Sequence, residues 1–493
     1  MKKVQKFLAV TLAMALVASS FTGCGKKAEE SDSSATTKND TQQTATATPT
    51  EAAKEETKTD EPAKEETEAE ATPTTAPTPT PAVMGDTSRE DAFYVYSYNT
   101  DALNNVMNYF QKFYPEDAER IVYVNTGGSN YYQTKLDAML QEPSNAQYPD
   151  LYVAEIDYLQ KYTDSEYSID VSELGITPDD YKNQYPYTLD LASVDGKVKG
   201  LSWQAAPGAM MYRRSLAKEY LGTEEPEEVQ EYFKDWNTML ETAKMINDKS
   251  GGKTKLLSGV DDVKRVYQAA RTSAWYDDNS KLMVDQTMLD YMDYAKQLYD
   301  LGLTNNTTQW TDAWSANAAS DSTFAYMGCT WFLQWTLKQN CGGTKPGEGT
   351  YGDWAMCAGP QSYYWGGCWL CVSPECSDKE LAAKILKAAT CDTEVMKEIC
   401  KGSLDYVNNK EAIAQLADEG EGTFDFLGGQ DFLKYFSPLA DSITLPPARG
   451  EDFYITLEFD KQVTQYTTGA KTKDQAVADF ETAVVDLYPY LSK

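Results

Sequence analysis

Two periods of apolar residues alternate along the chain after about residue 90. Short apolar runs at residues 93–98, 121–124 and 149–153 are typical of strands, while residues 101–114, 131–140 and 158–162 carry apolar side chains at helical spacing. Strand and helix therefore alternate three times. This pattern predicts an α/β fold with a parallel sheet covered by helices, in which ligands bind beyond the carboxyl ends of the strands.

Residues 195–212 predict two short strands joined by a flexible corner. A tight turn at Asp195-Gly196 precedes the first strand, and Pro207-Gly208 separates it from the second. The corner carries Trp203 and Gln204, a flat apolar ring beside an amide that both donates and accepts hydrogen bonds. This pair suits a sugar, and a core tryptophan in an ordinary strand is the alternative.

The remaining pattern predicts a mostly helical section followed by more mixed structure. The expected helices span residues 229–246, 261–276, 288–301, 331–337, 379–390 and 476–487, and the expected strands span 324–327, 354–358 and 367–373.

The N-terminus has the pattern of an export signal. Three lysines within the first six residues precede an apolar run at residues 7–18, and small residues lead to Cys24. This arrangement resembles a bacterial lipoprotein signal peptide over residues 1–23, with Cys24 as the lipidated first residue of the mature chain. We therefore expect a lipid anchor at the extracellular face of a membrane, in a Gram-positive type of cell.

Residues 24–88 predict a disordered tether. They are almost wholly Thr, Ala, Glu, Lys, Pro, Ser and Asp, with no aromatic residue from Gly25 to Ser88. Such a chain has a root-mean-square span of roughly 45 Å, which holds the folded residues 89–493 away from the membrane.

Charge and rare residues exclude several functions. The formal net charge is −32, which argues against nucleic acid and leaves neutral or cationic ligands open. No histidine is present, so histidine-dependent triads and zinc sites are excluded. Eight cysteines follow Cys24, all between Cys329 and Cys400, and we expect free buried thiols or structural disulfides rather than a metal or redox site.

The order of these parts resembles the extracellular solute-binding proteins of bacterial carbohydrate ABC importers, the maltose-binding-like family. The most specific segments are residues 195–204 (DGKVKGLSWQ), 207–216 (PGAMMYRRSL), 327–331 (MGCTW) and the Gly366-Gly367 pair before a strand. The resemblance implies two α/β lobes joined by a hinge, a ligand cleft between them, no enzymatic activity, no cofactor and no metal. It also implies a monomer that delivers a carbohydrate to the permease subunits of the importer.

The resemblance also implies lobe boundaries. Lobe one would span about residues 90–202 and 328–374, and lobe two about 203–327 and 375–493. The chain would cross between the lobes near residues 202–205, 327–331 and 373–376.

The candidate ligand-binding residues are aromatic and polar side chains expected near this cleft. The stacking surfaces would be Trp203, Trp331 and Trp365, supported by Tyr98, Trp275 and Tyr364. The polar candidates are Asn99, Gln204, Glu155, Asp157 and Arg449.

Four other functions are compatible with the sequence. The same fold would hold a polyamine or another cationic solute between carboxylates and aromatic rings, or iron through Tyr131-Tyr132 or Tyr363-Tyr364. A surface glycoside hydrolase would use two of the many carboxylates. A structural adhesin is the last alternative.

Overall fold

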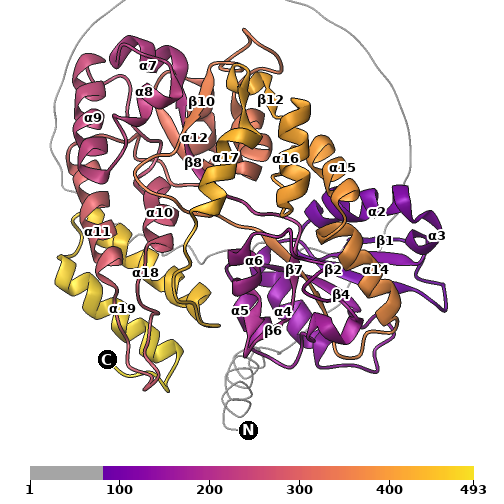
Figure 1. Ribbon diagram of the computed structural model, residues 1–493. Coiled ribbons are helices and arrows are strands. Elements are labelled where there is room, and N and C mark those ends of the chain that lie inside the picture. The colour runs from indigo at the N-terminus through magenta and orange to yellow at the C-terminus, as the bar shows by residue number, and fades with distance from the viewer. Residues whose placement is uncertain (1–81) are drawn as a thin grey trace, which may run out of the picture. The chain divides into compact units, whose positions relative to one another are not determined.

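The computed structural model describes residues 82–493 (Figure 1). The predicted signal peptide, the lipidation of Cys24 and most of the predicted tether lie outside the described residues. Within residues 82–493, no helix combines the length and the apolar character needed to cross a membrane.

The first half of the fold is built on a six-stranded sheet. Its strands lie in the order β1 (Ala82–Met84), β3 (Ile121–Asn125), β2 (Phe93–Ser97), β4 (Leu151–Glu155), β11 (Cys368–Val372) and β7 (Leu201–Ser202). The strand β2 pairs in parallel with both β3 and β4, as the alternation of strand and helix predicts. The strand β11 returns antiparallel to β4 from more than 200 residues later.

Helices cover this first sheet, and their order along the chain alternates with the strands. They are η1 (Leu103–Met107), α2 (Asn108–Phe113), α3 (Pro115–Ala118), α4 (Ser129–Leu140), α5 (Leu159–Thr163), η2 (Val171–Leu174) and α6 (Pro186–Leu191), and later in the chain α14 (Lys379–Thr390) and α15 (Thr393–Ser403). The helix α14 packs against β7, α2 and η2, and α15 packs against α2 and η1.

The second half of the fold is built on a three-stranded antiparallel sheet. Its strands lie in the order β10 (Trp354–Cys357), β8 (Gly208–Arg213) and β9 (Ala325–Cys329). The helices of this half are α7 (Arg214–Tyr220), α8 (Pro226–Gln230), α9 (Trp236–Lys249), η3 (Val260–Val263), α10 (Lys264–Ala269), α11 (Gln286–Asp300), α12 (Asp312–Ala316), η4 (Asn317–Ala319), α13 (Thr330–Phe332), η5 (Leu333–Leu337), η6 (Lys338–Asn340), α16 (Lys410–Glu419), η7 (Asp425–Leu427), α17 (Phe432–Asp441), α18 (Asp452–Thr467) and α19 (Lys473–Leu487). Two small hairpins, β5 (Ser193–Val194) with β6 (Lys197–Val198) and β12 (Thr423–Phe424) with β13 (Gln430–Asp431), complete the described strands.

Two predicted helices are shorter in the structure than their apolar spacing indicated. The expected helix 229–246 is broken into α8 and α9, because Asp235 leaves the helical conformation and its side chain accepts from the backbone N–H of Thr238 to start α9. The expected helix 261–276 ends at Ala269, and Trp275 follows in a loop. By contrast, α11, α14 and α19 confirm their predicted ranges within a few residues.

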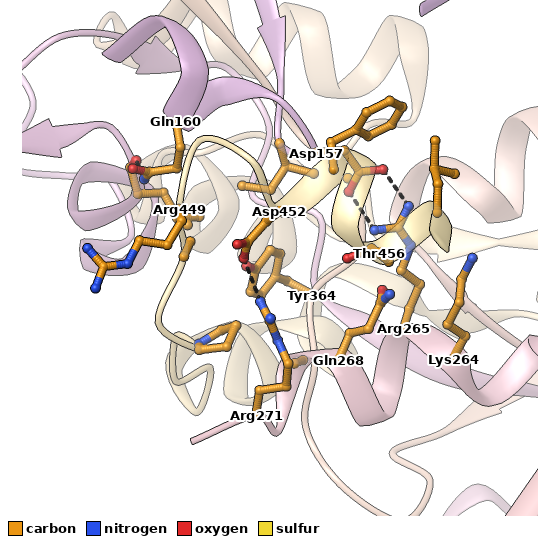
Figure 2. A pocket seen from close by; sticks show the side chains of 18 of the residues that line it. Asp157, Gln160, Lys264, Arg265, Gln268, Arg271, Tyr364, Arg449, Asp452 and Thr456 are labelled. Atoms are coloured by element: carbon orange, nitrogen blue, oxygen red, sulfur yellow. Dashed lines mark hydrogen bonds and ion pairs between the residues drawn. The ribbon is translucent and has the colours of Figure 1, made fainter. Parts of the chain in front are cut away.

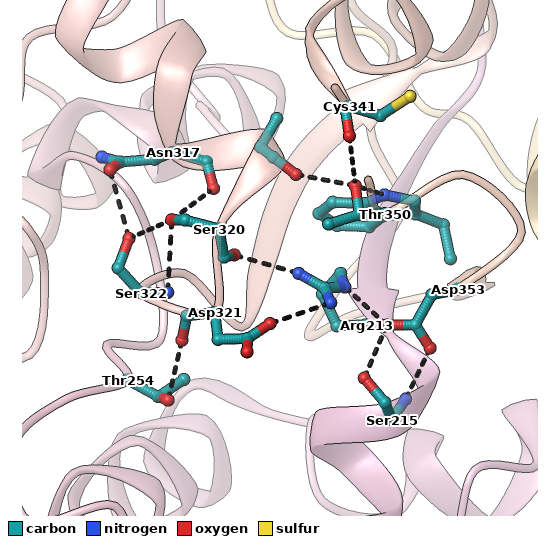
Figure 3. A network of polar contacts seen from close by, with 12 residues as sticks. Arg213, Ser215, Thr254, Asn317, Ser320, Asp321, Ser322, Cys341, Thr350 and Asp353 are labelled. Atoms are coloured by element: carbon teal, nitrogen blue, oxygen red, sulfur yellow. Dashed lines mark hydrogen bonds and ion pairs between the residues drawn. The ribbon is translucent and has the colours of Figure 1, made fainter. Parts of the chain in front are cut away.

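A polar network fixes the end of β8 to the segments around it (Figure 3). The Arg213 side chain is 5% exposed and donates to Asp353 at 2.7 Å, to Asp321 at 3.0 Å and to the carbonyl of Ser320 at 2.9 Å. Its guanidinium also lies 5.6 Å from the ring centroid of Trp354. The Arg213 that carried part of the family resemblance therefore has a structural role, since it joins β8 to β10 and to the turn before β9.

Three segments pass between the two sheets side by side, and we call them the crossing segments: residues 203–208, 363–365 and 405–408. Backbone hydrogen bonds connect them, from Ala205 to Tyr406 at 3.0 Å, from Asn408 to Trp203 at 2.8 Å and from Gly208 to Tyr363 at 2.8 Å. The first crossing was predicted from the sequence. The second and third lie at 363–365 and 405–408 and not near 327–331 and 373–376, because β10 pairs with β8 while α14 and α15 pack on the first half.

The exact lobe boundaries stay a proposal. The strand pairing supports a first lobe formed by the elements around the six-stranded sheet and a second lobe formed by those around the three-stranded sheet. On this basis residues 330–357, expected in lobe one, are assigned to the second lobe, and residues 379–403, expected in lobe two, to the first.

Candidate functional site

A cavity of about 130 Å³ lies between side chains of the two lobes (Figure 2). From the first lobe it is lined by Ile156 and Asp157, which follow β4, by Gln160 on α5 and by Leu191. From the second lobe it is lined by α10, by residues 446–449 and by the first half of α18. The loop after β4 is the carboxyl end of a parallel strand, the position that the sequence pattern predicted for a ligand.

An ion pair joins the two lobes at one end of this cavity. The Nη1 and Nη2 atoms of Arg265 on α10 each donate to one carboxylate oxygen of Asp157, both at 2.6 Å. About a quarter of each side chain is exposed. The geometry is bidentate, which makes this the strongest kind of Arg–carboxylate contact.

The electrostatic surroundings shift the pKa values of Asp157 and of the nearby Glu155 in opposite directions. Burial by itself raises the pKa of Asp157, but the charge and hydrogen bonds of Arg265 outweigh it and hold the pKa below its usual range. Burial and the nearby charge of Asp157 both raise the pKa of Glu155 well above its usual range. Arg265 thus stabilises the charged form of Asp157, while burial and the charge of Asp157 disfavour the charged form of Glu155.

Three further cations line the cavity, each paired with a carboxylate. The Nη2 atom of Arg271 lies 2.8 Å from Asp452, and Lys264 lies 2.8 Å from Asp460. Arg449 lies 2.8 Å from Asp278, whose side chain is 93% exposed and does not line the cavity. The cavity therefore gathers four cations and three carboxylates, in a chain with 44 basic and 76 acidic residues.

A cluster of tryptophan rings adjoins the cavity beyond Gly366. The centroids of Trp331 and Trp365 are 5.3 Å apart, and Trp310 stacks on Trp331 at 6.1 Å with 21° between the rings. The Nε1 of Trp331 donates to the carbonyl of Trp365 at 2.9 Å. The guanidinium of Arg265 lies 5.9 Å from the Trp365 ring centroid, which connects the cluster to the interlobe ion pair.

Glycine at position 366 permits this arrangement. Gly366 lines the cavity and has a φ of +77°, a left-handed conformation that favours glycine. A Cβ at this position would lie 2.7 Å from Nε1 of Trp331 and displace its ring. Trp310, which is 55% exposed, also holds a left-handed φ of +71° although it is not a glycine. Such strained positions are concentrated at functional sites.

Five of the predicted ligand-binding residues are at or beside this site, and Glu155 is close to it. Asp157, Tyr364 and Arg449 line the cavity, and Trp331 and Trp365 form the adjoining ring cluster. Glu155 precedes the cavity-lining loop and is influenced by Asp157 and Arg265. Their contact with a ligand stays a prediction.

The other predicted residues lie outside the cavity lining. Trp203 is wholly buried and Gln204 donates through Nε2 to Asp405, so both belong to the interior of the crossing segments. Trp275 is 1% exposed and packs between Phe459 and Phe480, because its loop folds under α18 and α19. Tyr98 contacts the thiol of Cys368 at 3.3 Å, and Asn99 donates to Asp101 at 2.5 Å.

Several residues of the site were not predicted from the sequence. They are Arg265, Arg271, Lys264, Asp452 and Trp310. The arginines offered one signal: the chain contains only seven, and Arg265, Arg271 and Arg449 all line this cavity. No local pattern marks Asp452 or Trp310, since their positions depend on how α18 and the 305–311 loop pack.

The cysteines and carboxylates give no metal site among the described residues. No group of three or more candidate ligands converges within residues 82–493. All eight cysteines in this range are free thiols, and Cys368 and Cys371 make contacts on opposite faces of β11, with Tyr98 and near Gly200 respectively.

Comparison with solved structures identifies the same fold. An extracellular solute-binding protein of family 1 matches with a TM-score of 0.66 and 17% identity, over 81% of this chain and 99% of the other. A β-1,6-galactobiose complex of an ABC transporter associated binding protein from B. animalis subsp. lactis matches with a TM-score of 0.62 and 18% identity, over 80% and 97% of the two chains. The lacto-N-biose complex of a binding protein from Bifidobacterium longum matches with a TM-score of 0.61 and 16% identity, over 81% and 98%.

The comparison of sequences gives two results. No curated protein matches the chain. The family model described as bacterial extracellular solute-binding protein matches residues 108–421, which is more than half of the chain. This match includes β3, β4, β7 to β11 and all three crossing segments. The chain, with its two lobes and its interlobe cavity, therefore belongs to the bacterial extracellular solute-binding proteins.

Proposed function

We propose that this protein captures a mono- or oligosaccharide between its lobes and delivers it to the permease of an ABC importer. The observation that carries the proposal is the cavity itself, which lies between the lobes and adjoins the cluster of Trp310, Trp331 and Trp365. Tryptophan rings stack on the C–H faces of sugars, and the paired arginines and carboxylates offer in-plane hydrogen bonds to hydroxyl groups.

The size of the cavity supports binding by lobe closure. At about 130 Å³ it is smaller than the roughly 300–1,000 Å³ of sites for drug-sized ligands. The ion pair between Asp157 and Arg265 already joins the lobes. Rotation about the crossing segments would enlarge the cavity to admit a sugar ring and then close on it, as hinge-bending binding proteins do.

The cavity lining favours a carbohydrate over a cationic solute. A polyamine would need carboxylates free to pair with it. Asp157, Asp452 and Asp460 are each already paired with a cation, which leaves only Oδ1 of Asp452 and Oδ1 of Asp460 without a hydrogen-bond partner. The lining also contains one more cation than carboxylate. Capture without turnover, rather than hydrolysis, is part of this proposal, as are a monomeric state and a lipid anchor at Cys24.

The test is a thermal-shift screen of the purified protein against sugars, polyamines, amino acids and metals. A ligand that binds only the folded state raises its free energy of unfolding, by about 2.7 kcal/mol at a concentration of 100 Kd. We expect a shift with one class of sugar and no release of reducing ends on prolonged incubation. A shift with polyamines alone would contradict the proposal, and release of new reducing ends would indicate an enzyme.

A further inference from the structure

The arginines of the chain are concentrated at the cavity. Three of the seven arginines of the chain, Arg265, Arg271 and Arg449, line this one cavity together with Lys264. Arginine is the side chain that best matches the planar geometry of a carboxylate or sulfate oxyanion. In a chain of net charge −32, this cavity is lined by four cations and three carboxylates, so its balance of charge is opposite in sign to that of the whole chain.

Arg271 has donors that the protein itself does not use. Its side chain is 8% exposed, its Nη2 is bound by Asp452, and its Nε and Nη1 atoms are buried without a hydrogen-bond partner. A buried, charged donor without a partner has lost its hydration and gained no hydrogen bond, so these N–H groups favour an acceptor supplied from elsewhere. Figure 2 shows Arg271 reaching toward Asp452, with Tyr364 beside them.

Arg271 pairs with Asp452 and lies 5.1 Å from the Trp275 ring centroid. Within this pair, Oδ1 of Asp452 is also buried without a hydrogen-bond partner. Burial raises the pKa of its only carboxylate partner, Asp452, despite the attraction of Arg271. Burial also raises the pKa of Tyr364, while the charges of Arg271 and Arg265 oppose this rise and those of Asp157 and Asp452 add to it.

The guanidinium of Arg449 lies 5.1 Å from the Tyr276 ring centroid and pairs with Asp278, whose side chain is 93% exposed. Such an exposed ion pair contributes little to stability and can be exchanged at little cost.

From these contacts we propose that the ligand is an acidic carbohydrate, whose carboxylate or sulfate oxyanion is bound by Arg271 with support from Arg449. The inference rests on the proposed carbohydrate function and narrows it. Arg265 is committed to Asp157 and forms the interlobe contact, so it does not bind the anion. The overall acidity of the chain, which at first favoured neutral or cationic ligands, does not describe this cavity.

The test compares acidic sugars with their neutral parents by isothermal titration calorimetry. The probes are digalacturonate against galactobiose, glucuronosyl-glucose against cellobiose, and galactose 6-sulfate against galactose. We expect at least one acidic probe to bind at least tenfold more tightly than its parent, with an affinity that falls as NaCl rises. The uronate and sulfate arms then distinguish the two oxyanions.

Variants connect this preference to Arg271. The change Arg271→Gln with Asp452→Asn removes both charges of the buried pair, so no uncompensated charge remains, and it should abolish the preference for the acidic probe. Arg449→Gln should reduce the preference in part without affecting folding, because this side chain is 35% exposed. The control is Arg89→Gln, which removes one charge from a surface pair with Asp91 outside the cavity lining and should leave the preference unchanged.

The results separate the two proposals. Tighter binding of the neutral parents would overturn the acidic-ligand inference and leave the carbohydrate function intact. An acidic preference that persists in both the Arg271 and Arg449 variants would overturn the assignment of these residues. Binding of no sugar, neutral or acidic, would contradict the carbohydrate function and this inference with it.

Discussion

The guanidinium of Arg265 meets both carboxylate oxygens of Asp157 at 2.6 Å and thereby joins α10 of the second lobe to the loop after β4 of the first. Both side chains are also part of the cavity wall. One contact thus both closes the lobes and shapes the site. A ligand changes the balance between open and closed states only through its different affinity for the two. We expect the ion pair to favour the closed state in the ligand-free protein.

Replacing Asp157 by Asn should therefore open the ligand-free protein. The charge-assisted hydrogen bonds lost are typically worth about 1.5–3 kcal/mol. We expect a larger radius of gyration by small-angle X-ray scattering and weaker ligand binding. Asp441→Asn, which breaks the exposed pair with Lys410 between α16 and α17, is the control. An unchanged radius and affinity in Asp157→Asn would show that the pair does not control closure.

Trp310→Ala should weaken carbohydrate binding with little effect on folding. The side chain is 55% exposed, so its removal loses little buried area, but it extends the surface of Trp331. We expect a loss of about 1–3 kcal/mol in binding free energy, the range of a central aromatic contact. Trp335, 47% exposed and on η5, provides a matched control in Trp335→Ala, which should bind normally. Equal losses in both variants would contradict a specific role for Trp310.

Trp203→Ala should destabilise the protein rather than act on the ligand alone. The ring is wholly buried, at the crossing segments. Truncation of a buried tryptophan typically costs about 3–5 kcal/mol in the free energy of unfolding. Urea denaturation followed by circular dichroism measures this loss. A folded variant with normal stability and reduced ligand affinity would instead indicate that Trp203 contacts the ligand.

The stability of the crossing segments should depend on pH through Asp405. Burial raises the pKa of Asp405 to about 7, although the amide of Gln204 opposes the rise. Between its usual pKa near 4 and about 7, the folded protein holds a proton that the unfolded chain releases. Stability therefore falls as pH rises through this window and changes no further above it.

Asp405→Asn removes this dependence, because asparagine stays neutral and keeps an oxygen for Gln204. We expect the variant to show a flatter melting temperature between pH 5 and 8 and to melt higher than the unmodified protein at pH 8. Asp262, whose pKa burial raises to about 8, leaves a residual slope. Glu241→Gln on the exposed surface of α9 is the control. If the melting temperature of Asp405→Asn depended on pH as strongly as that of the unmodified protein, Asp405 would not be the group responsible.

The sequence pattern predicted the elements in which apolar residues recur at a regular helical or strand period. The strands β2, β3 and β4 and the helices α11, α14 and α19 follow from apolar period alone, and the parallel pairing follows from their alternation. The break between α8 and α9 at Asp235 was not predicted. An aspartate that caps the start of a new helix is equally compatible, in sequence, with the exposed surface of one continuous helix.

Apart from Arg449, the predicted residues of the site lie near strand ends. Asp157 follows β4, and Tyr364 and Trp365 lie just before β11. The local sequence pattern therefore marked them as candidate ligand-binding residues. Arg271 and Asp452 are 181 residues apart and meet only because their segments pack together. Trp203 lies outside the cavity lining because the crossing segments lie against each other and bury its ring. A single sequence does not show which segments pack together in this way.

The backbone hydrogen bonds among the three crossing segments have a mechanical consequence. Because Ala205, Tyr406, Asn408 and Gly208 are tied across neighbouring segments, the segments resist sliding past one another and yield mainly by bending together. Motion then pivots about a short axis, and displacement grows with distance from it as along a lever arm. A small rotation at the pivot would be amplified at the edges of the lobes, where a membrane partner can tell a loaded protein from an empty one.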